Sequence, residues 1–499
     1  STPKCKHSVV AAWTPPACWL GLKHSENKDH MTVFSGKILI QNEWQTPDSG
    51  ATLPVVDPST GEVFDQIARG TAGDVHRAVE SAQSALDGEW GRLTAVERGR
   101  LLTKLGQLIG QHEDQLAELE ARDVGKPLKQ ARVDARACAR YFEFYGGAAD
   151  KVHGETIPYL EGYTVLTIRE PHGVTGHIIP WNYPMQIIGR TIGGALTMGN
   201  ACVLKPGEEA SQTALYLGQL AVEAGFPAGT LNIVPGLGKE AGTALLHHPG
   251  IQHFSFTGSP EVGGLVQTAA AQRAIPVTLE LGGKSPQVVF ADADLDKALP
   301  FLVNAAIQNA GQTCSAGSRV LVENSICEQL TERIAARFRM LQSGPALQDL
   351  DCGPLVSQAQ KSRLQRYLKQ ARADGLEFVA EGCIVDDAPS GGNYVAPCLL
   401  GNVPADHAVA QKELFGPVLA ILPFQDEDEA VALANGTAFG LVSGVWTKDG
   451  SRQFRMAKRL KSGQVFINNY GAGGGVELPF GGVKLSGHGR EKGFEALYG

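Results

Sequence analysis

Apolar and polar positions alternate with helical spacing in the first third of the chain. Between about Asp74 and Asp123, apolar residues recur every three to four positions with charged residues between them. This spacing places the apolar side chains on one face of a helix. The stretch therefore predicts amphipathic helices that pack against a core. The apolar positions are Val75, Val79, Ala82, Leu101, Leu102, Leu105, Leu108 and Ile109.

The pattern becomes β-like between Lys151 and Glu170. Two short β-rich runs, at 155–158 and 163–168, are separated by a few residues that include Gly162. Two such runs around a turn predict a hairpin. Because the exposed edge of a hairpin has unpaired backbone groups, we expect it to pair with a neighbouring subunit.

Apolar strands then alternate with stretches of helical length. A first series predicts strands at 174–179, 201–204, 230–234, 253–257 and 277–280, and a second series at 285–290, 320–322, 418–422 and 465–467. Alternation of this kind is typical of parallel, doubly wound sheets. The sequence therefore predicts two α/β lobes with a ligand-binding crevice between them.

Charge and cysteine usage exclude several classes of function. The chain has 499 residues, a formal net charge of −8 and nine cysteines, and no CxxC or HExxH motif. Without a basic field we expect no nucleic-acid partner, and without these motifs we expect no metal. No apolar run reaches 18 residues, so we expect no membrane span. Scattered, unpaired cysteines favour a reducing, cytoplasmic location.

The first 30 residues are expected to be a leader that is disordered or not native to the protein. Lys4, Cys5 and Lys6 precede a moderately apolar stretch, which superficially resembles a secretion signal. Pro15 and Pro16 interrupt that stretch, and no small-residue cleavage site follows. The leader therefore indicates nothing about function.

A phosphate-binding loop is the first candidate for chemistry. The run Gly236–Gly242 approaches a GxGxxG motif but has the wrong last interval, so it is weak by itself. A better candidate is Gly258–Ser259, which ends a β-rich run and precedes Pro260 at a predicted helix start. Free backbone N–H groups there suit a pyrophosphate. The alternative is an ordinary strand-to-helix turn with Ser259 as the N-cap.

Two polar residues lie where predicted strands end. Glu280 closes an apolar strand just before a Gly-Gly loop, so it is a candidate general base, unless it simply pairs with Lys284 or another cation. Asn182 lies between Pro180 and Pro184, and a rigidly held amide N–H₂ is a good oxyanion donor. Its alternative is a turn asparagine bonded to its own backbone.

Cys314 is the candidate nucleophile. It lies in a loop of small residues after an apolar helical stretch at 303–307. A free thiol has a pKa of about 8.5, so a nucleophilic cysteine needs local activation. Taken alone, one of nine cysteines is more often inert packing. Only its combination with Asn182 and Glu280 favours catalysis.

From about Met31 onward, the chain resembles the aldehyde dehydrogenase superfamily. Seven segments match motifs of that family in order, and a chance match of all seven is implausible. They are Pro180–Pro184, Leu204–Glu208, Phe256–Ser259, Leu279–Lys284, Gly311–Cys314, Glu413–Pro417 and Pro479–Gly482.

The resemblance implies a fold and a set of domains. The fold would be α/β, with two Rossmann-like lobes and a projecting β-hairpin for oligomerisation. The cofactor-binding domain would comprise 31–150 and 170–281, and the catalytic domain 282–484. The oligomerisation element would comprise 151–169 and 485–499, with its last strand cut short relative to relatives. A homodimer or homotetramer is expected.

The resemblance also implies a reaction, the oxidation of an aldehyde to a carboxylic acid with NAD, or NADP, as cofactor. Cys314 would attack the carbonyl, Asn182 and the Cys314 N–H would hold the oxyanion, and Glu280 would activate water to hydrolyse a thioester. Glu208 favours NAD because a carboxylate repels a 2′-phosphate, although Gly207 replaces a common serine.

Cofactor and substrate residues follow from the same resemblance. Glu413 and Phe415 would hold the nicotinamide end, Lys205 and Glu208 the adenosine ribose, and Gly258 and Ser259 the pyrophosphate. The remaining expected cofactor contacts are Ile178, Trp181 and Gly238. The expected substrate pocket comprises Tyr183, Ile187, Arg190, Thr313, Ser315 and the loop from Tyr470 to Leu478.

Several alternatives remain open from the sequence. Arg190 stands where relatives often have an aromatic residue, so it either receives a carboxylate-bearing aldehyde or is structural. One rival activity is a CoA-acylating aldehyde dehydrogenase, against which Glu280 argues. A rival of another class is a catalytically silent structural or binding protein on the same fold.

Overall fold

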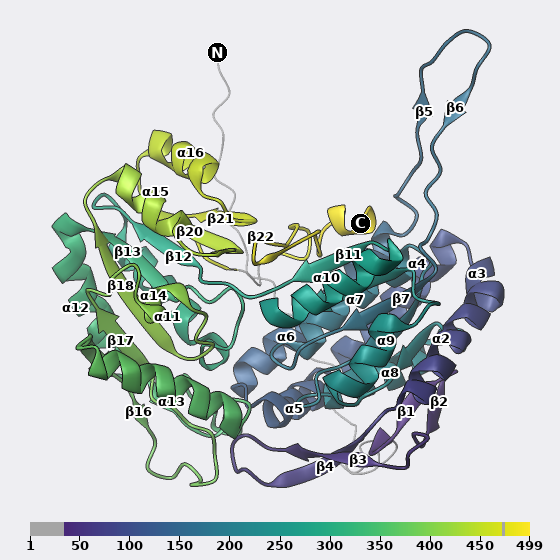
Figure 1. The fold of residues 1–499 in the computed structure, drawn as a ribbon, viewed down its shortest axis with the longest axis horizontal. Helices are drawn as coiled ribbons and strands as arrows, with labels where there is room; N and C mark the ends of the chain where they lie inside the picture. The colour runs from purple at the N-terminus through teal and green to yellow at the C-terminus, as the bar shows by residue number, and fades with distance from the viewer. Residues whose placement is uncertain (1–33, 472–474) are drawn as a thin grey trace, which may run out of the picture. The chain divides into compact units, whose positions relative to one another are not determined.

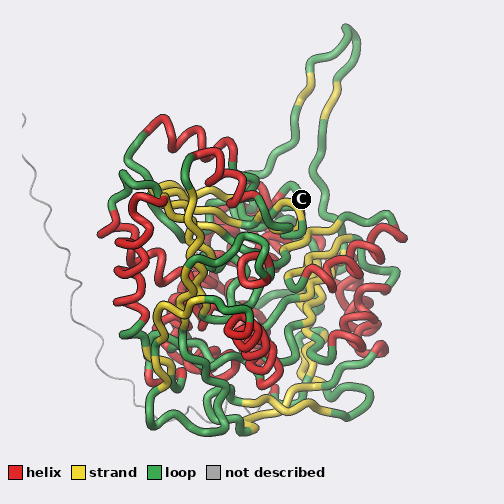
Figure 2. Tube along the Cα trace, turned by 60° about the vertical axis from the view of Figure 1, so that its left-hand side comes forward, coloured by secondary structure: helices red, strands yellow, loops and turns green. Residues whose placement is uncertain are grey.

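The computed structural model describes residues 34–471 and 475–499. The expected leader at 1–30 lies outside the described residues. Residues 34–499 cluster as one compact unit, within which two α/β lobes are each built on their own sheet (Figures 1 and 2). The prediction of an α/β fold with two mainly parallel sheets is confirmed.

The first sheet contains the strands of the first predicted series. Its strands in spatial order are β2 (Glu43–Gln45), β1 (Ile38–Ile40), β9 (Leu231–Ile233), β8 (Ala201–Lys205), β7 (Val174–Ile178), β10 (His253–Thr257), β11 (Val277–Glu280) and β23 (Gly487–His488). The five strands from β9 to β11 are parallel, and β1, β2 and β23 join the edges antiparallel. The chain order reverses between β7 and β10, where doubly wound sheets bind ligands at the carboxyl ends.

The predicted amphipathic region forms the helices α2 to α5. Two of these helices begin with a capping box, in which Thr71 and Asp74, or Thr94 and Glu97, bond each other's backbone N–H. The helices of this lobe are α2 (Ala72–Asp87), α3 (Glu89–Arg92), α4 (Ala95–Gln111), α5 (Glu113–Val124), α6 (Leu128–Ala148), α7 (Pro184–Thr197), α8 (Gln212–Ala224), α9 (Thr243–His247) and α10 (Pro260–Arg273).

The second sheet contains all four strands of the second predicted series and three that the pattern missed. In spatial order its strands are β15 (Glu377–Glu381), β17 (Cys398–Gly401), β18 (Val418–Phe424), β13 (Arg319–Glu323), β12 (Pro286–Val289), β20 (Val442–Trp446) and β21 (Gln464–Ile467). Every neighbouring pair is parallel except β15 with β17. β15, β17 and β20 are the missed strands.

Helices also cover this second sheet, and the core between them is apolar. Trp446, Phe290, Phe338 and Phe424 are among its largest fully buried side chains. The helices are α11 (Leu295–Ile307), α12 (Cys327–Phe338), α13 (Gln358–Ala373), α14 (Ala408–Gln411), α15 (Glu427–Asn435) and α16 (Gly450–Arg459). The break between the two sheets falls between Glu280 and Pro286.

The predicted hairpin projects from the first lobe, as both views show (Figures 1 and 2). Its strands β5 (Thr156–Ile157) and β6 (Val165–Leu166) are antiparallel. Three other small sheets pair β3 (Thr52–Val56) with β4 (Val63–Ala68), β14 (Gln342–Ser343) with β16 (Cys383–Ile384), and β19 (Phe439–Gly440) with β22 (Val483–Lys484). None of the helices described is long and apolar enough to cross a membrane.

The C-terminal segment 485–499 packs on the first lobe. Its strand β23 extends the first sheet beside β11, and Leu497 packs with Tyr141 and Tyr145. The segment that the resemblance groups with the hairpin thus also covers the first lobe.

Candidate active site

A cavity of about 440 Å³ lies where the carboxyl edge of the first sheet meets the amino edge of the second. Loops that follow β7, β10 and β11 line it from the first sheet, and loops that precede β13 and β18 line it from the second. The expected site residues among its lining are Trp181, Asn182, Tyr183, Ile187, Arg190, Gly258, Ser259, Glu280, Thr313, Cys314, Ser315, Glu413 and Phe415. Ile178, Lys205, Glu208 and Gly238 lie outside the lining.

The Cys314 loop has an unusual backbone. After α11 ends, Asn309, Ala310 and Gly311 all have positive φ, at 50°, 53° and 72°. This run turns the chain sharply, and a Cβ on Gly311 would lie 2.1 Å from the Gly416 carbonyl oxygen. Positive φ is costly without glycine, so packing must hold the loop. The result is a half-buried thiol at the cavity wall.

Burial makes the Cys314 thiol a weak acid in this state. It raises the pKa of the thiol to about 12, while Arg190 opposes this shift and Glu413 and Glu280 add to it. A close approach by the Gly282–Gly283 loop fixes the backbone, because a Cβ on Gly283 would lie 2.1 Å from the Cys314 carbonyl oxygen. The thiol therefore needs local positive charge to ionise.

Asn182 reaches the Cys314 loop. Its Nδ2 donates to the Gln312 carbonyl at 3.0 Å, and its own carbonyl accepts from Asn309 Nδ2 at 3.0 Å. The side chain is buried and does not bond its own turn, so the alternative of a self-bonded turn asparagine is wrong. Because an amide N–H₂ carries two donors, one N–H remains for a ligand beside Cys314.

Glu280 is the last residue of β11 and is almost fully buried. Neither carboxyl oxygen has a hydrogen-bond partner among the described residues, and the expected alternative of a pair with Lys284 is not observed. Burial raises the pKa of Glu280 well above its ordinary value, with Arg190 opposing. An unpartnered buried carboxyl is costly, so its presence in a cavity points to chemistry.

Glu413 and Phe415 line the cavity from the loop that precedes β18. Glu413 Oε1 accepts from the Gly283 N–H at 2.9 Å, and burial raises its pKa to about 7. The Phe415 ring stands edge-on to Trp181 with ring centroids 5.5 Å apart. Both therefore border the same part of the cavity.

Ser259 caps α10, as the alternative reading of that turn expected. Its side chain accepts from the Val262 N–H at 3.3 Å, and Pro260 occupies the first turn. The N-terminus of this 14-residue helix nevertheless lines the cavity, so its free N–H groups lie at the site. The capping role and the phosphate-loop role are compatible.

Lys205 and Glu208 form an ion pair just beyond the cavity. Lys205 Nζ lies 2.7 Å from Glu208 Oε2, which lowers the pKa of Glu208 despite burial, and the Gly238 N–H donates to Glu208 at 3.4 Å. A Cβ on Gly207 would lie 2.9 Å from the Trp181 nitrogen. Gly207, which replaces the serine common in relatives, therefore lies where its backbone approaches the backbone of Trp181 closely. Ile178 pairs with Lys205 between β7 and β8.

The expected substrate residues cluster beside Cys314. Thr313 Oγ1 lies 3.3 Å from Ser315 Oγ, and Lys126 Nζ lies 3.8 Å from the centre of the Tyr183 ring. Arg190 is buried and forms an ion pair with Glu491, which favours the structural alternative for this arginine.

Sequence reasoning missed the residues that support the site. Asn309 and Gln312 hold the cysteine loop, because Gln312 donates to the Asn309 carbonyl at 3.0 Å and accepts from the Val356 N–H. Gln360 and Arg363, one turn apart on α13, donate to the Phe415 and Glu413 carbonyls at 2.7 and 2.8 Å. Their spacing indicates a shared helix face, but no local signal identifies the loop they hold.

The fold and the site together define a two-lobed α/β protein with a thiol, an amide and a buried carboxyl at one cavity. The aldehyde dehydrogenase family model matches residues 44–498. Retinal dehydrogenase 2 of Homo sapiens is 42% identical over 462 residues, which cover 92% of this chain and 88% of that protein. The mitochondrial aldehyde dehydrogenase family 2 member B4 of Arabidopsis thaliana is 41% identical and covers 93% and 86%.

Solved structures of aldehyde dehydrogenases also superpose on this chain. A Burkholderia cenocepacia protein assigned as an aldehyde dehydrogenase superposes with a TM-score of 0.92 and 63% identity, over 93% of this chain and 97% of that one. The NAD⁺ complex of a Bacillus cereus aldehyde dehydrogenase superposes at 0.91 with 37% identity, over 95% and 96%. This chain belongs to the aldehyde dehydrogenase family.

Proposed function

We propose that this protein oxidises an aldehyde to a carboxylic acid, with NAD as hydride acceptor and Cys314 as nucleophile. The observation that carries the proposal is the convergence of Cys314, Asn182 and Glu280 on one cavity. The membership of this chain in the aldehyde dehydrogenase family supports the same reaction. The three side chains supply a nucleophile, an oxyanion donor and a base, which are the groups that acyl transfer to water requires.

The part of the cavity wall formed by the N-terminus of α10, Glu413 and Phe415 fits a dinucleotide. The N-terminus of α10 offers N–H groups suited to a pyrophosphate, and Glu413 offers a carboxylate suited to ribose hydroxyls. Bound NAD supplies a hydride-accepting ring. Phe415 and Trp181 would border that ring, while Lys205 and Glu208, with Gly238 and Ile178 nearby, would receive the adenosine end.

The protein's own groups would divide the reaction into two halves. The Cys314 sulfur adds to the carbonyl carbon, and the Asn182 N–H and the Cys314 backbone N–H stabilise the oxyanion. Bound NAD would supply the hydride acceptor needed to convert this adduct to a thioester on Cys314. Glu280 then takes a proton from a water that attacks the thioester, which releases the acid and the thiol.

Hydrolysis is favoured over acyl transfer to CoA. A buried Glu280 with no partner among the described residues serves to accept a proton from water, and a thiol acceptor has less need of it. If product formation required CoA and no free acid appeared, this part of the proposal would be wrong.

An NAD-reduction assay across aliphatic, aromatic, amino and carboxylated aldehydes tests the function. We expect Cys314→Ala to abolish turnover, because removal of a nucleophile costs about 10³-fold or more. Cys383→Ala, which alters an exposed cysteine away from the cavity, is the matched control. Turnover by Cys314→Ala equal to that of the control would overturn the assignment, and it would leave the catalytically silent alternative or another nucleophile.

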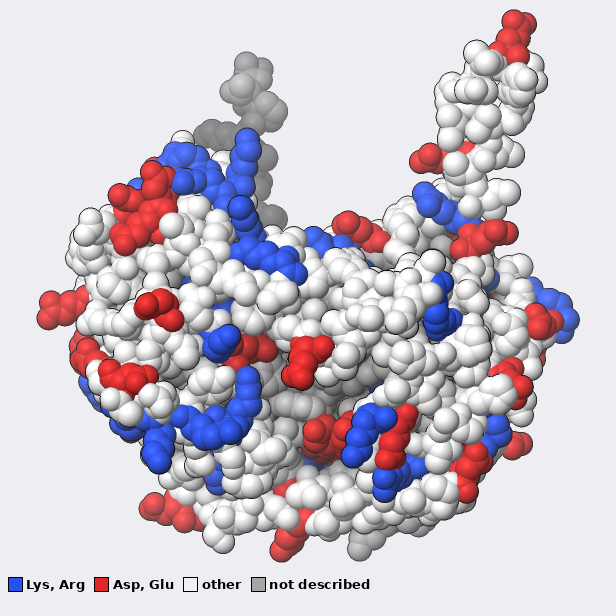
Figure 3. Space-filling model, in the orientation of Figure 1, with Lys and Arg blue, Asp and Glu red and all other residues white. Residues whose placement is uncertain are grey.

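We further propose that the hairpin joins subunits into a homodimer or homotetramer. Tyr159, Leu160, Tyr163, Leu166 and Ile168 are exposed on it, and Figure 3 shows few charges along its length. A large exposed apolar surface is typical of an interface. Sedimentation of a Tyr163→Ser/Leu166→Ser variant should reveal smaller species, and an unchanged mass would contradict the proposal.

A cytoplasmic location is proposed from thiol chemistry. The seven cysteines in the described ranges are all free. Free thiols are stable in a reducing compartment. Fractionation of the source cells would test this location.

A further inference from the structure

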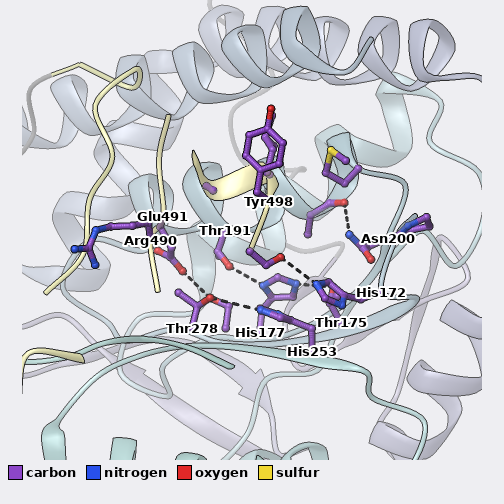
Figure 4. A pocket seen from close by; sticks show the side chains of 18 of the residues that line it. His172, Thr175, His177, Thr191, Asn200, His253, Thr278, Arg490, Glu491 and Tyr498 are labelled. Carbon is purple, nitrogen blue, oxygen red and sulfur yellow. Dashed lines mark hydrogen bonds between the residues drawn. The ribbon is translucent and has the colours of Figure 1, made fainter. Parts of the chain in front are cut away.

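A second cavity of about 290 Å³ shares Arg190 in its lining with the cavity that contains Cys314. Strands β7 and β10, the base of the hairpin and the segment 490–499 line it (Figure 4). Figure 4 shows His177 and His253 within it and Glu491 at its side.

Several polar groups of the second cavity hydrogen-bond to one another. His177 lies 2.8 Å from Thr175 Oγ1 and 2.7 Å from Thr191 Oγ1 through its two ring nitrogens. Ser255 Oγ donates to Glu491 Oε1 at 2.6 Å. These hydrogen bonds between lining side chains therefore indicate a structural role for His177 and Ser255.

Arg190 is the only charged residue among those described that lines both cavities. Its Nε pairs with Glu491, which lines the second cavity, and its Nη2 donates at 3.1 Å to the Oγ1 of Thr257, which lines the catalytic cavity. Its guanidinium also lies 5.1 Å from the centre of the Phe480 ring. Three contacts from separate elements thus fix the group in place.

Arg190 also lines the catalytic cavity together with Cys314 and Glu280. The groups that interact with it are Glu491, Glu280, Cys314 and Tyr141. Arg190 opposes the burial that raises the pKa of both Cys314 and Glu280, whereas Glu491 acts on Glu280 in the opposite direction. Because a guanidinium does not deprotonate in proteins, this charge is permanent.

We propose that Arg190 is a positioning residue that holds a fixed positive charge in the cavity that Cys314 and Glu280 line, and that Glu491 and Thr257 hold it there. The inference rests on the proposed function only in that Cys314 is the nucleophile. It assigns the buried arginine to activation of the site and not to recognition of a substrate carboxylate, since Glu491 already neutralises one side of the guanidinium.

The test measures the acidity of Cys314 directly. In the full chain without aldehyde, the rate of iodoacetamide alkylation of the Cys314 peptide is followed by mass spectrometry against pH. Exposed Cys383 in the same sample is the internal control. Arg190→Gln removes the positive charge, Glu491→Gln removes its counter-charge, and the double variant removes both without leaving a buried carboxylate unpaired.

The proposal requires an upward shift wherever the charge of Arg190 is removed. In Arg190→Gln and in the double variant we expect the Cys314 profile to move up by about one pH unit, or about tenfold slower alkylation below the midpoint. In Glu491→Gln, which keeps the charge of Arg190 but removes a contact that holds it, we expect a smaller upward shift. Thr257→Val, which keeps the charge but removes one hydrogen bond, should produce a smaller upward shift.

One outcome overturns the proposal even where Arg190→Gln does not fold. The outcome is an unfolding temperature of the double variant equal to that of the wild type, together with an unchanged Cys314 alkylation profile. In that case Arg190 is only structural. If instead Arg190→Gln raises KM for carboxylated aldehydes alone and leaves alkylation unchanged, the arginine recognises substrate and the proposal is wrong. Persistent turnover in Cys314→Ala would instead defeat the proposed function, independently of these profiles.

Discussion

The two cavities that share Arg190 in their lining use buried polar groups in opposite ways. In the catalytic cavity, neither carboxyl oxygen of Glu280 has a hydrogen-bond partner among the described residues. In the second cavity, His177 and Ser255 are bonded to neighbours. Unsatisfied buried groups destabilise a fold, so they persist where chemistry uses them. Glu280 therefore differs from His177 and Ser255 in having no hydrogen bond among the described residues that would account for its burial.

The sharpest way to break the comparison is Glu280→Gln. The amide fits the same space but cannot accept a proton, so we expect steady-state turnover to fall by about 10²–10⁴-fold. The first turnover should still release NADH as a burst. Quenched-flow measurement of burst and steady rates checks this, and a turnover within about twofold of wild type would remove Glu280 from catalysis.

The pH dependence of thioester hydrolysis follows from the burial of Glu280. Because the pKa of Glu280 is raised, its basic form increases with pH, and thioester hydrolysis should rise with pH through that pKa. The same rise should be absent from the residual steady rate of Glu280→Gln. A rise of equal size in both proteins would assign the titration to another group.

Asn182→Ala is expected to have the next largest effect. Loss of one oxyanion donor costs about 10²–10³-fold in kcat. The matched control is Asn200→Ala, since Asn200 lines the second cavity and its amide bonds only the backbone carbonyl of Ala195 and the N–H of Gly173. That variant should lose stability but keep its rate, and equal rate losses in the two variants would erase the contrast between the cavities.

A smaller change is expected in cofactor choice. Glu208 carries a carboxylate whose pKa is lowered by Lys205, so it repels a 2′-phosphate. In Glu208→Gln we expect the preference for NAD over NADP to fall by about tenfold, the result of losing about 1.4 kcal/mol of repulsion. Comparison of kcat/KM for both cofactors tests this, and an NADP preference in the wild type would contradict it.

The smallest effect on rate is expected from His177→Gln, a change in the second cavity. Burial lowers the pKa of His177 to about 3, whereas the unfolded chain has an ordinary histidine. Between these values the unfolded state binds the extra proton, so stability should fall as pH falls through this range, by up to about 1.4 kcal/mol per pH unit. Glutamine can bond Thr175 and Thr191 without titrating.

Urea unfolding at several pH values measures that slope. We expect it to be shallower in His177→Gln than in wild type between pH 6 and 4, with turnover preserved at neutral pH. An identical slope in both proteins would show that His177 does not carry this part of the acid sensitivity.

Much of the fold was predictable because its determinants are local in sequence. The helical spacing between Asp74 and Asp123 and the apolar runs that became β7, β8 and β10 depend on near neighbours alone. Strands β15, β17 and β20 were missed. The antiparallel edges β1 and β23 were also missed, because edge pairing depends on which distant strand is exposed and not on the strand's own residues.

The site divides in the same way. The sequence by itself determined the motifs that contain Cys314, Asn182 and Glu280, and with them the family of the protein. Only the tertiary structure decided that Asn182 bonds the cysteine loop, that Glu280 is unpartnered among the described residues and that Arg190 pairs with Glu491 across about 300 positions. Burial and charge pairing depend on contacts between residues far apart in sequence, and these contacts exist only after the chain has folded.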